Sequence, residues 1–228
     1  MAKIVACKLT YFNIKGKGEP IRLACNYAGL PLEDVRVSRE EFQAMREAKE
    51  IPFNQLPVAE FFDDEGRSVC KVAQTRAILR TVARASGDKL YSSDLGQAAS
   101  IDSFLDFEED LFAAMRSSIF PGRIGMDEYK DDAEKEARRA HVAETVFTSK
   151  LELLDRALSA SQTGWVAGTG EPSIADFALT ASLGWIDSGI VDGVPQGFVV
   201  GKFPRVGTYL EKFAALEENK AYYASKET

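Results

Sequence analysis

The repeat of apolar residues changes character along this sequence, and that change limits the possible folds more than any other feature. Residues 3–86 alternate between strand-like and helix-like patterns, which is typical of an α/β unit. From residue 92 onward, apolar residues recur at helical spacing and strand signals nearly vanish. The chain is therefore predicted to form an α/β domain over residues 1–87 and an all-helical domain over residues 93–228, with the boundary in the polar stretch 87–94.

The first domain is predicted to contain four strands and three helices in the order β-α-β, α, β-β, α. The expected strands cover residues 3–9 and 32–37 and a hairpin over 57–72, and the expected helices follow Pro20 and cover 40–50 and 73–87. Gly29 and Gly87 are expected to end two of these helices.

The second domain is predicted from four long amphipathic segments. Helical spacing is clear over residues 100–115, 143–158, 172–186 and 203–216. The third segment begins with a capping signal of the form S-x-x-D, from Ser173 to Asp176. Such helices need partners on which to bury their apolar faces, so we expect them to pack together.

Composition excludes several classes of function. A net charge of −7 without a clustered basic face argues against nucleic-acid binding. The first apolar run is flanked by Lys3 and Lys8, and no run approaches the roughly 18 apolar residues of a membrane span. We therefore expect a soluble, cytoplasmic protein. His141 is the only histidine, and three distant cysteines form no CxxC, so a Ser-His-Asp triad, a zinc site and a disulfide framework are not expected.

Three motifs in the first domain carry a family resemblance. They are "YFNIKGKGEPIRL" from Tyr11, "QLPVAEF" from Gln55 and "AQTRAILR" from Ala73, and "SIADF" follows in the second domain. In this order they resemble the cytosolic glutathione transferases of the tyrosine type, most closely the sigma class. The resemblance covers essentially the whole chain. It implies a thioredoxin-like first domain with a cis-proline at Pro57, an all-helical second domain and a homodimer.

The resemblance also implies a role for Tyr11. A thiol with a pKa of about 8.5 is mostly protonated at neutral pH, whereas the nucleophile is the thiolate. A hydroxyl that donates a hydrogen bond to sulfur favours the charged form. Lowering the pKa by about two requires roughly 2.7 kcal/mol, more than one neutral hydrogen bond of ~1 kcal/mol supplies. We therefore expect help from Lys17 and from a helix end. Without its neighbours, Tyr11 would be read as half-buried packing and "GKG" as a turn.

The remaining glutathione contacts are assigned in the same way. The backbone of Leu56, turned outward by a cis Pro57, is expected to pair with the peptide main chain, and Gln55 and Pro57 are expected to bind glutathione beside it. Gln74 and Thr75 open a helix whose positive end suits the γ-glutamyl carboxylate. A plain helix cap is the alternative for this pair, and both roles are compatible.

Three positions outside those motifs complete the expected glutathione site. Phe42 and Arg46 stand where related classes carry Trp-x-x-x-Lys against the glycine end, with Lys49 as the alternative to Arg46. Asp102 matches the acidic residue that reaches glutathione from the partner subunit, although a solvated helix face explains it nearly as well.

The electrophile pocket has the weakest signal, because its residues look like core. Phe12, Leu111 and Met115 are the expected lining, whereas Phe104, Phe107 and Phe112 are assigned to core or interface. The predicted function is conjugation of glutathione to an apolar electrophile, with no metal. A glutathione-dependent isomerase of the prostaglandin type and a non-catalytic ligand-binding or structural member of the fold are the alternatives. A cysteine-type thiol-disulfide transferase is disfavoured, because Cys7 lies inside the first strand.

Overall fold

The computed structural model describes residues 3–226, which divide into two compact units. One unit runs up to Ala98 and includes the C-terminal segment from Ala215, and the other runs from Ala99 to Ala214. The sequence assigned that C-terminal segment to the helical domain, whereas its contacts in the structure are with the first unit.

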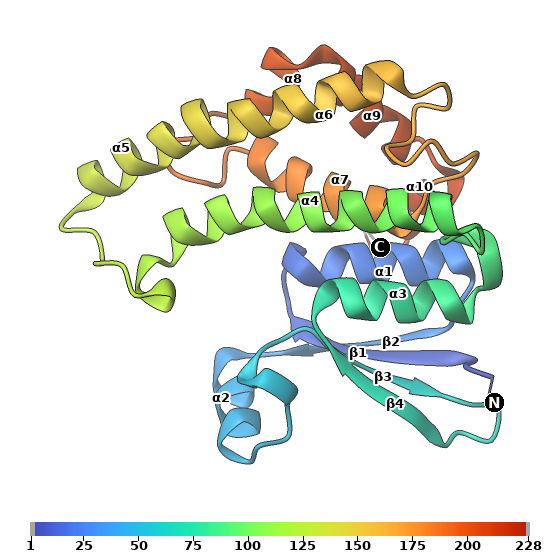
Figure 1. The fold of residues 1–228 in the computed structure, drawn as a ribbon. Coiled ribbons are helices and arrows are strands. Elements are labelled where there is room, and N and C mark those ends of the chain that lie inside the picture. Colours follow the sequence, from blue (N-terminus) through green and yellow to red (C-terminus); the bar gives the residue numbers. More distant parts are fainter. Residues whose placement is uncertain (1–2, 227–228) are drawn as a thin grey trace. The chain divides into compact units, whose positions relative to one another are not determined.

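The first unit is a mixed sheet with helices (Figure 1). Its elements are β1 (Ala6–Phe12), α1 (Glu19–Ala28), β2 (Leu32–Val37), α2 (Arg39–Glu47), β3 (Val58–Phe62), β4 (Ser68–Ala73), α3 (Thr75–Ala85) and α10 (Glu217–Ala224). The four strands have the order β2-β1-β3-β4, with β2 parallel to β1 and both other pairs antiparallel. This is the thioredoxin-like arrangement that the sequence predicts, and its order of elements is confirmed.

Helices α1 and α3 lie side by side on one face of this sheet, and α2 lies on the other side (Figure 1). The alternating residues of β1 explain this packing, because Cys7, Leu9 and Tyr11 are buried while their neighbours are only half-buried. Gly29 ends α1 with φ 68°, as expected of a left-handed C-cap.

Strand β1 differs from the prediction at both ends. It begins at Ala6 rather than at residue 3, and it continues through Phe12, which pairs with Val37 of β2. The ladder with β2 therefore places Tyr11 inside the strand, one residue before its end.

The predicted hairpin is also present, with its turn built by Asp63. The Asp63 carboxylate accepts hydrogen bonds from the backbone N–H groups of Glu65 and Arg67, at 3.0 Å and 2.9 Å. An aspartate that binds backbone N–H groups two and four residues further on is a typical way to hold such a turn.

The second unit is entirely helical and contains most of α4. Its elements are α4 (Leu95–Ile119), α5 (Asp132–Val142), α6 (Thr148–Ala160), α7 (Ile174–Asp187), α8 (Phe198–Lys202) and α9 (Pro204–Ala214). A π-helical turn, Ala143–Phe147, joins α5 to α6, so the helix predicted over 143–158 is present with an irregular first turn. Within residues 3–226, no helix is both long enough and apolar enough to span a bilayer.

Helix α7 forms the centre of this second unit. Most of its residues are buried, and it packs against α8 and α9. Its predicted capping signal is present, because Asp176 accepts a hydrogen bond from the Ser173 N–H at 2.7 Å. Asp176 is itself fully buried and also accepts from Tyr209, so the start of α7 is fixed by polar contacts inside the core.

Candidate active site

Tyr11 lies near the end of β1 with 7% of its surface exposed. Its hydroxyl oxygen accepts a hydrogen bond of 3.1 Å from the backbone N–H of Lys17. Burial raises the pKa of Tyr11, and the Lys17 hydrogen bond and the positive charge of Arg22 offset this only in part. The phenol is therefore protonated at neutral pH and is a hydrogen-bond donor there.

Two glycines of the short turn Gly16–Gly18 enclose the Tyr11 ring. A Cβ atom on Gly16 would lie 2.7 Å from the Tyr11 hydroxyl oxygen, and one on Gly18 would lie 2.6 Å from its Cδ1. Real Cβ atoms do not approach other atoms so closely, so a side chain at either position would displace the ring. The sequence "GKG" is thus required by close contact with Tyr11, which is more than the flexible turn that its composition indicates.

Arg22 binds the main chain of the same loop. The sequence analysis did not identify it as a residue of the site. Its guanidinium is 1% exposed and donates to the carbonyl oxygen of Ile14 at 2.9 Å. It forms ion pairs with Glu19 at 3.2 Å and Asp34 at 3.0 Å. A buried arginine needs such partners, since an unpaired buried charge is strongly destabilising. The available signal was a pair of charged residues, Glu19 and Arg22, in a helix that is otherwise uncharged.

Thr75 connects the start of α3 to the Tyr11 loop. Its hydroxyl donates a hydrogen bond of 3.3 Å to the carbonyl oxygen of Lys17. Gln74 precedes it as the N-cap residue, with φ 74° and an exposed side chain. A glutamine in that backbone region is uncommon, and such conformations persist where the surrounding structure imposes them. The structure thus brings Tyr11, Lys17 and Thr75 together, with Gln74 directly beside them.

The segment before β3 contains the predicted proline. The Leu56–Pro57 peptide bond is cis, as the resemblance implies. Pro57 is buried, Leu56 is half-buried and Gln55 is exposed. Leu56 also packs against a buried cluster that contains Val58 of β3 and Ala73 of β4, so this segment is joined to the sheet of the first unit.

Helix α2 carries Phe42 and Arg46. The Phe42 ring packs edge-on against Phe12, with the ring centroids 5.2 Å apart. Arg46 is exposed and lies over the Phe42 ring, with its guanidinium carbon 5.6 Å from the ring centroid. Lys49, the alternative to Arg46, is exposed and has φ 56° just beyond the helix. Phe42 therefore has a packing role in the structure, whereas both cations face solvent.

The predicted residues of the second unit have a different character. Asp102 is half-buried on α4 and has an electrostatic or hydrogen-bonding partner. Leu111 and Met115, further along α4, are completely buried. Their burial is what a residue of the helical core shows, and it gives no support to their assignment as pocket lining.

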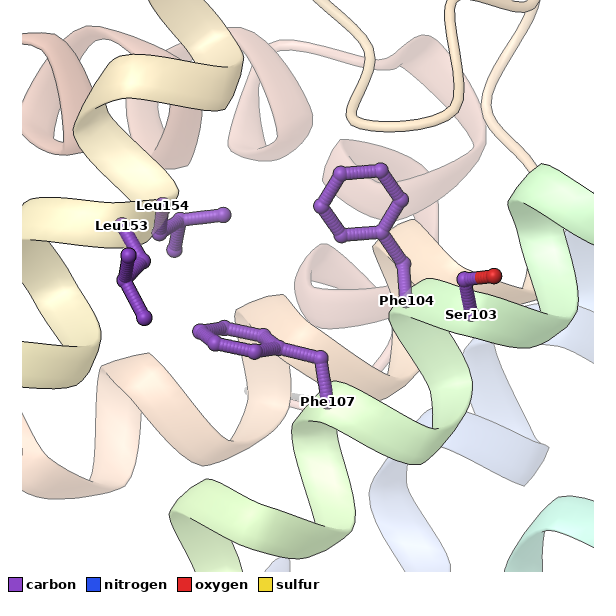
Figure 2. A pocket seen from close by; sticks show the side chains of 5 residues that line it. All are labelled: Ser103, Phe104, Phe107, Leu153 and Leu154. Atoms are coloured by element: carbon purple, nitrogen blue, oxygen red, sulfur yellow. The ribbon is translucent and has the colours of Figure 1, made fainter.

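A cavity of about 250 Å³ lies elsewhere in this unit, between α4 and α6. Figure 2 shows the rings of Phe104 and Phe107 on α4 directed towards Leu153 and Leu154 on α6. Ser103 completes the lining. The sequence assigned both phenylalanines to core or interface, and they are half-buried here.

The potential metal ligands of the described residues are scattered. Among residues 3–226, no group of three or more His, Cys, Asp or Glu side chains is arranged to hold a metal ion. Cys7 and Cys25 are buried free thiols, and Cys70 is a half-buried one. Burial and the electrostatic effect of Cys7 raise the pKa of Cys70, and the hydrogen bond to Cys7 raises that of Cys25. Cys25 and Cys70 are therefore poor nucleophiles at neutral pH.

Comparison with solved structures places the fold among known proteins. A glutathione S-transferase described as a major nematode-specific form from C. elegans has a TM-score of 0.75 at 28% identity, covering 97% of this chain and 96% of that one. Prostaglandin synthase D of Nilaparvata lugens has a TM-score of 0.76 at 24% identity, covering 96% and 97%, and supports the fold alone.

Sequence comparison is more specific. The family model described as the C-terminal domain of glutathione S-transferase matches residues 123–226. Probable glutathione S-transferase 5 of Caenorhabditis elegans is 30% identical over 227 residues, 98% of each chain. Glutathione S-transferase 1 of Ascaris suum is 32% identical over 219 residues, 96% of each chain. Other relatives are named as mu-class, pi-class and nu-class proteins, so the sigma assignment stays a prediction. Because these matches extend over nearly the whole chain, this protein belongs to the glutathione S-transferase family.

Proposed function

We propose that this protein is a glutathione transferase in which the Tyr11 hydroxyl stabilises the thiolate of bound glutathione. The observation that carries the proposal is the environment of Tyr11. Its oxygen accepts a hydrogen bond from Lys17 N–H, and the glycines of the Gly16–Gly18 turn fix its ring. The Tyr11 hydroxyl then donates a hydrogen bond to the glutathione sulfur, because a phenol with a raised pKa stays protonated at neutral pH.

The reaction follows from the chemistry of the thiolate. The thiol proton leaves to solvent, the sulfur attacks an electrophilic carbon, and a sulfur–carbon bond forms as the leaving group departs with its electron pair. A hydrogen bond to a charged group contributes about 1.5–3 kcal/mol, which corresponds to a pKa lower by about one to two. Lys17 and the first turn of α3 are the additional sources of positive potential that we assign.

Glutathione is proposed to lie along one edge of the first unit. The main chain of Leu56 pairs with the peptide, with Gln55 and Pro57 beside it, and Gln74 and Thr75 hold the γ-glutamyl end. The hydrogen bond between Thr75 and Lys17 supports this, because it joins the start of α3 to the Tyr11 loop.

Two further contacts are proposed for the ends of glutathione. Arg46, with Lys49 as the alternative, pairs with the glycine carboxylate beside Phe42, and the exposure of both cations is consistent with this. Asp102 of the partner subunit binds the γ-glutamyl amine in a homodimer. That assignment is supported by the family membership and by the half-buried position of Asp102 on α4.

The electrophile is proposed to be a small apolar molecule that contacts Phe12, whereas the complete burial of Leu111 and Met115 assigns these two expected lining residues to the helical core. Support is best for Phe12, whose ring centroid lies 5.5 Å from that of Tyr11. A cytoplasmic role in detoxification of reactive electrophiles would suit such a pocket, and no metal takes part in this chemistry.

Conjugation of glutathione to an aryl halide, measured for the wild type and Tyr11→Phe, tests this function. We expect the variant to lose about tenfold or more in kcat/KM, because a charge-assisted hydrogen bond is removed. Retention on immobilised glutathione is the matched measurement, and both proteins should be retained. Equal activity of the two proteins, or failure of the wild type to bind glutathione, contradicts the proposal.

A further inference from the structure

The loop that follows β1 is held by contacts from Arg22 to its main chain. Arg22 Nη1 donates to the carbonyl oxygens of Ile14 at 2.9 Å and Lys15 at 3.4 Å, and Nη2 donates to that of Phe12 at 3.4 Å. The guanidinium carbon also lies 5.8 Å from the centroid of the Tyr11 ring. The position of this loop, and with it the Lys17 N–H that binds Tyr11, therefore depends on how Arg22 is oriented.

Glu19 is one of the two carboxylates that orient Arg22. It is 6% exposed, it lies one turn before Arg22 on α1, and its Oε2 is 3.2 Å from Arg22 Nη1. A long charged side chain that is buried in this way keeps one geometry only while its partners keep theirs. Whatever fixes Glu19 therefore fixes Arg22.

The C-terminal helix α10 contacts both Glu19 and the loop through Tyr223. The Tyr223 hydroxyl donates a hydrogen bond to Glu19, and burial together with that carboxylate raises the pKa of Tyr223. The ring of the same tyrosine faces the Lys15 ammonium, which lies 4.8 Å from the ring centroid. One side chain of α10 thus contacts the loop directly and through Glu19.

Other contacts anchor α10 on the first unit. The Asn26 side-chain amide donates to the carbonyl oxygen of Glu218 at 2.8 Å, and Asn219 is 1% exposed. Helix α10 also packs along α1, the helix that carries Glu19 and Arg22. Helix α10 is therefore a packed part of the first unit, although it lies some 200 residues away in sequence from the loop that it contacts.

We propose that Tyr223 is a positioning residue for catalysis: through Glu19 and Lys15, the C-terminal helix holds the loop that places the Tyr11 hydroxyl. The inference rests on the proposed role of Tyr11 in activating glutathione. It goes beyond that role, because it assigns a function in the thiolate site to a helix that contains none of the residues proposed to bind glutathione.

Amide hydrogen exchange of the full-length protein tests the placement without glutathione. Tyr223→Phe removes the hydroxyl and keeps the ring, and Tyr222→Phe makes the same change one residue away on the same helix. We expect exchange at residues 13–18 to quicken by about fivefold in Tyr223→Phe, as for the loss of one hydrogen bond, and by less than about twofold in Tyr222→Phe, because the Tyr222 hydroxyl interacts with Glu19 only electrostatically. Equal exchange in the two variants overturns the proposal.

Kinetics then separate positioning from general destabilisation. Tyr223→Phe should raise the pKa of the bound glutathione thiol and lower kcat/KM by about fivefold, whereas in the Tyr11→Phe background it should have no further effect on that pKa. An equal loss of activity in both backgrounds overturns the positioning role. If instead Tyr11→Phe alone leaves activity unchanged, the proposed function fails, and the exchange experiment still decides the placement.

Lys15→Met tests the same contact in a second variant, in case Tyr223→Phe does not fold. Lys15 is exposed and methionine has a side chain of similar length, so this variant should fold normally. It removes only the cation facing the Tyr223 ring, so we expect about a twofold faster exchange at residues 13–18. Wild-type exchange in Lys15→Met would contradict the direct contact between α10 and the loop.

Discussion

The Tyr11 end of the first unit and the interior of the second unit use their residues in opposite ways. Around Tyr11, individual atomic contacts determine which residue types fit. A Cβ at Gly18 would lie 2.6 Å from the Tyr11 ring, and the Lys17 backbone N–H binds the Tyr11 hydroxyl. Along α4, the apolar Leu111 and Met115 are completely buried. The first arrangement tolerates few residue types, whereas the second requires only apolar side chains of suitable volume.

This difference explains why the motifs of the two units carry unequal information. A hydrogen bond or a close approach fixes both the residue type and its spacing, so the Tyr11 segment is recognisable in the sequence. An apolar pocket and an apolar core are built from the same residues, so neither is recognisable in that way. The cavity lined by Phe104, Phe107 and Leu153 illustrates this, because the sequence placed these phenylalanines in core or interface.

The largest effect is expected from the core of the second unit. Leu111→Ala should lower the free energy of unfolding by about 2–5 kcal/mol, because it deletes a completely buried side chain. Leu153→Ala, at a residue that is 44% exposed, should cost under about 1 kcal/mol and is the matched control. Denaturant unfolding of the whole chain measures both. Similar small costs would indicate that Leu111 lines an open pocket after all.

A somewhat smaller effect is expected where the glycines enclose Tyr11. Gly18→Ala should destabilise the protein by about 1–3 kcal/mol through overpacking against the ring, and kcat/KM should fall with it. Gly184→Ala is the control in the second unit, since a Cβ there meets open space within α7, and it should raise stability by about 0.5–1 kcal/mol. Thermal unfolding of both variants compares them. A stabilised Gly18→Ala would contradict the enclosure of Tyr11.

The smallest effect is a pH dependence of stability in the first unit. Burial alone would raise the pKa of Asp34, but hydrogen bonds from Arg22 and Arg36 lower it on balance. A carboxyl group with a lowered folded-state pKa stabilises the fold above its unfolded value of about 3.9 and loses this contribution as the pH falls through the folded value.

Urea unfolding at a series of pH values measures this contribution. The stability advantage of the wild type over Asp34→Asn should therefore be constant from neutral pH down to about pH 5 and shrink below about pH 4. An advantage that persists undiminished in acid would show that Arg22 does not depend on the charge of Asp34.

Much of the fold could be predicted because local signals and tertiary structure agree. The strand over residues 32–37, the stop at Gly29, the hairpin turn and the start of α7 all follow from patterns within a few residues of each other. Helix α10 is too short and too polar to be distinguished from a loop by its pattern, since its stability comes from docking on α1.

The candidate site shows the same limit. Tyr11 lies near a strand end, and its loop is joined to Thr75 through Lys17, but the roles of these residues in binding glutathione stay predictions. The partners of Arg22 do not follow from the sequence, because Asp34 belongs to another strand and only the folded sheet brings it within 3.0 Å. Long-range pairing of buried charges leaves no local pattern.

Titration of the bound glutathione thiol tests the central claim most directly. The ultraviolet absorbance of the thiolate is followed against pH in the wild type and in Tyr11→Phe, each saturated with glutathione. We predict a thiol pKa below that of free glutathione in the wild type, and a pKa higher by about one to two in the variant. Identical titration curves for the two proteins would contradict the role of the Tyr11 hydroxyl.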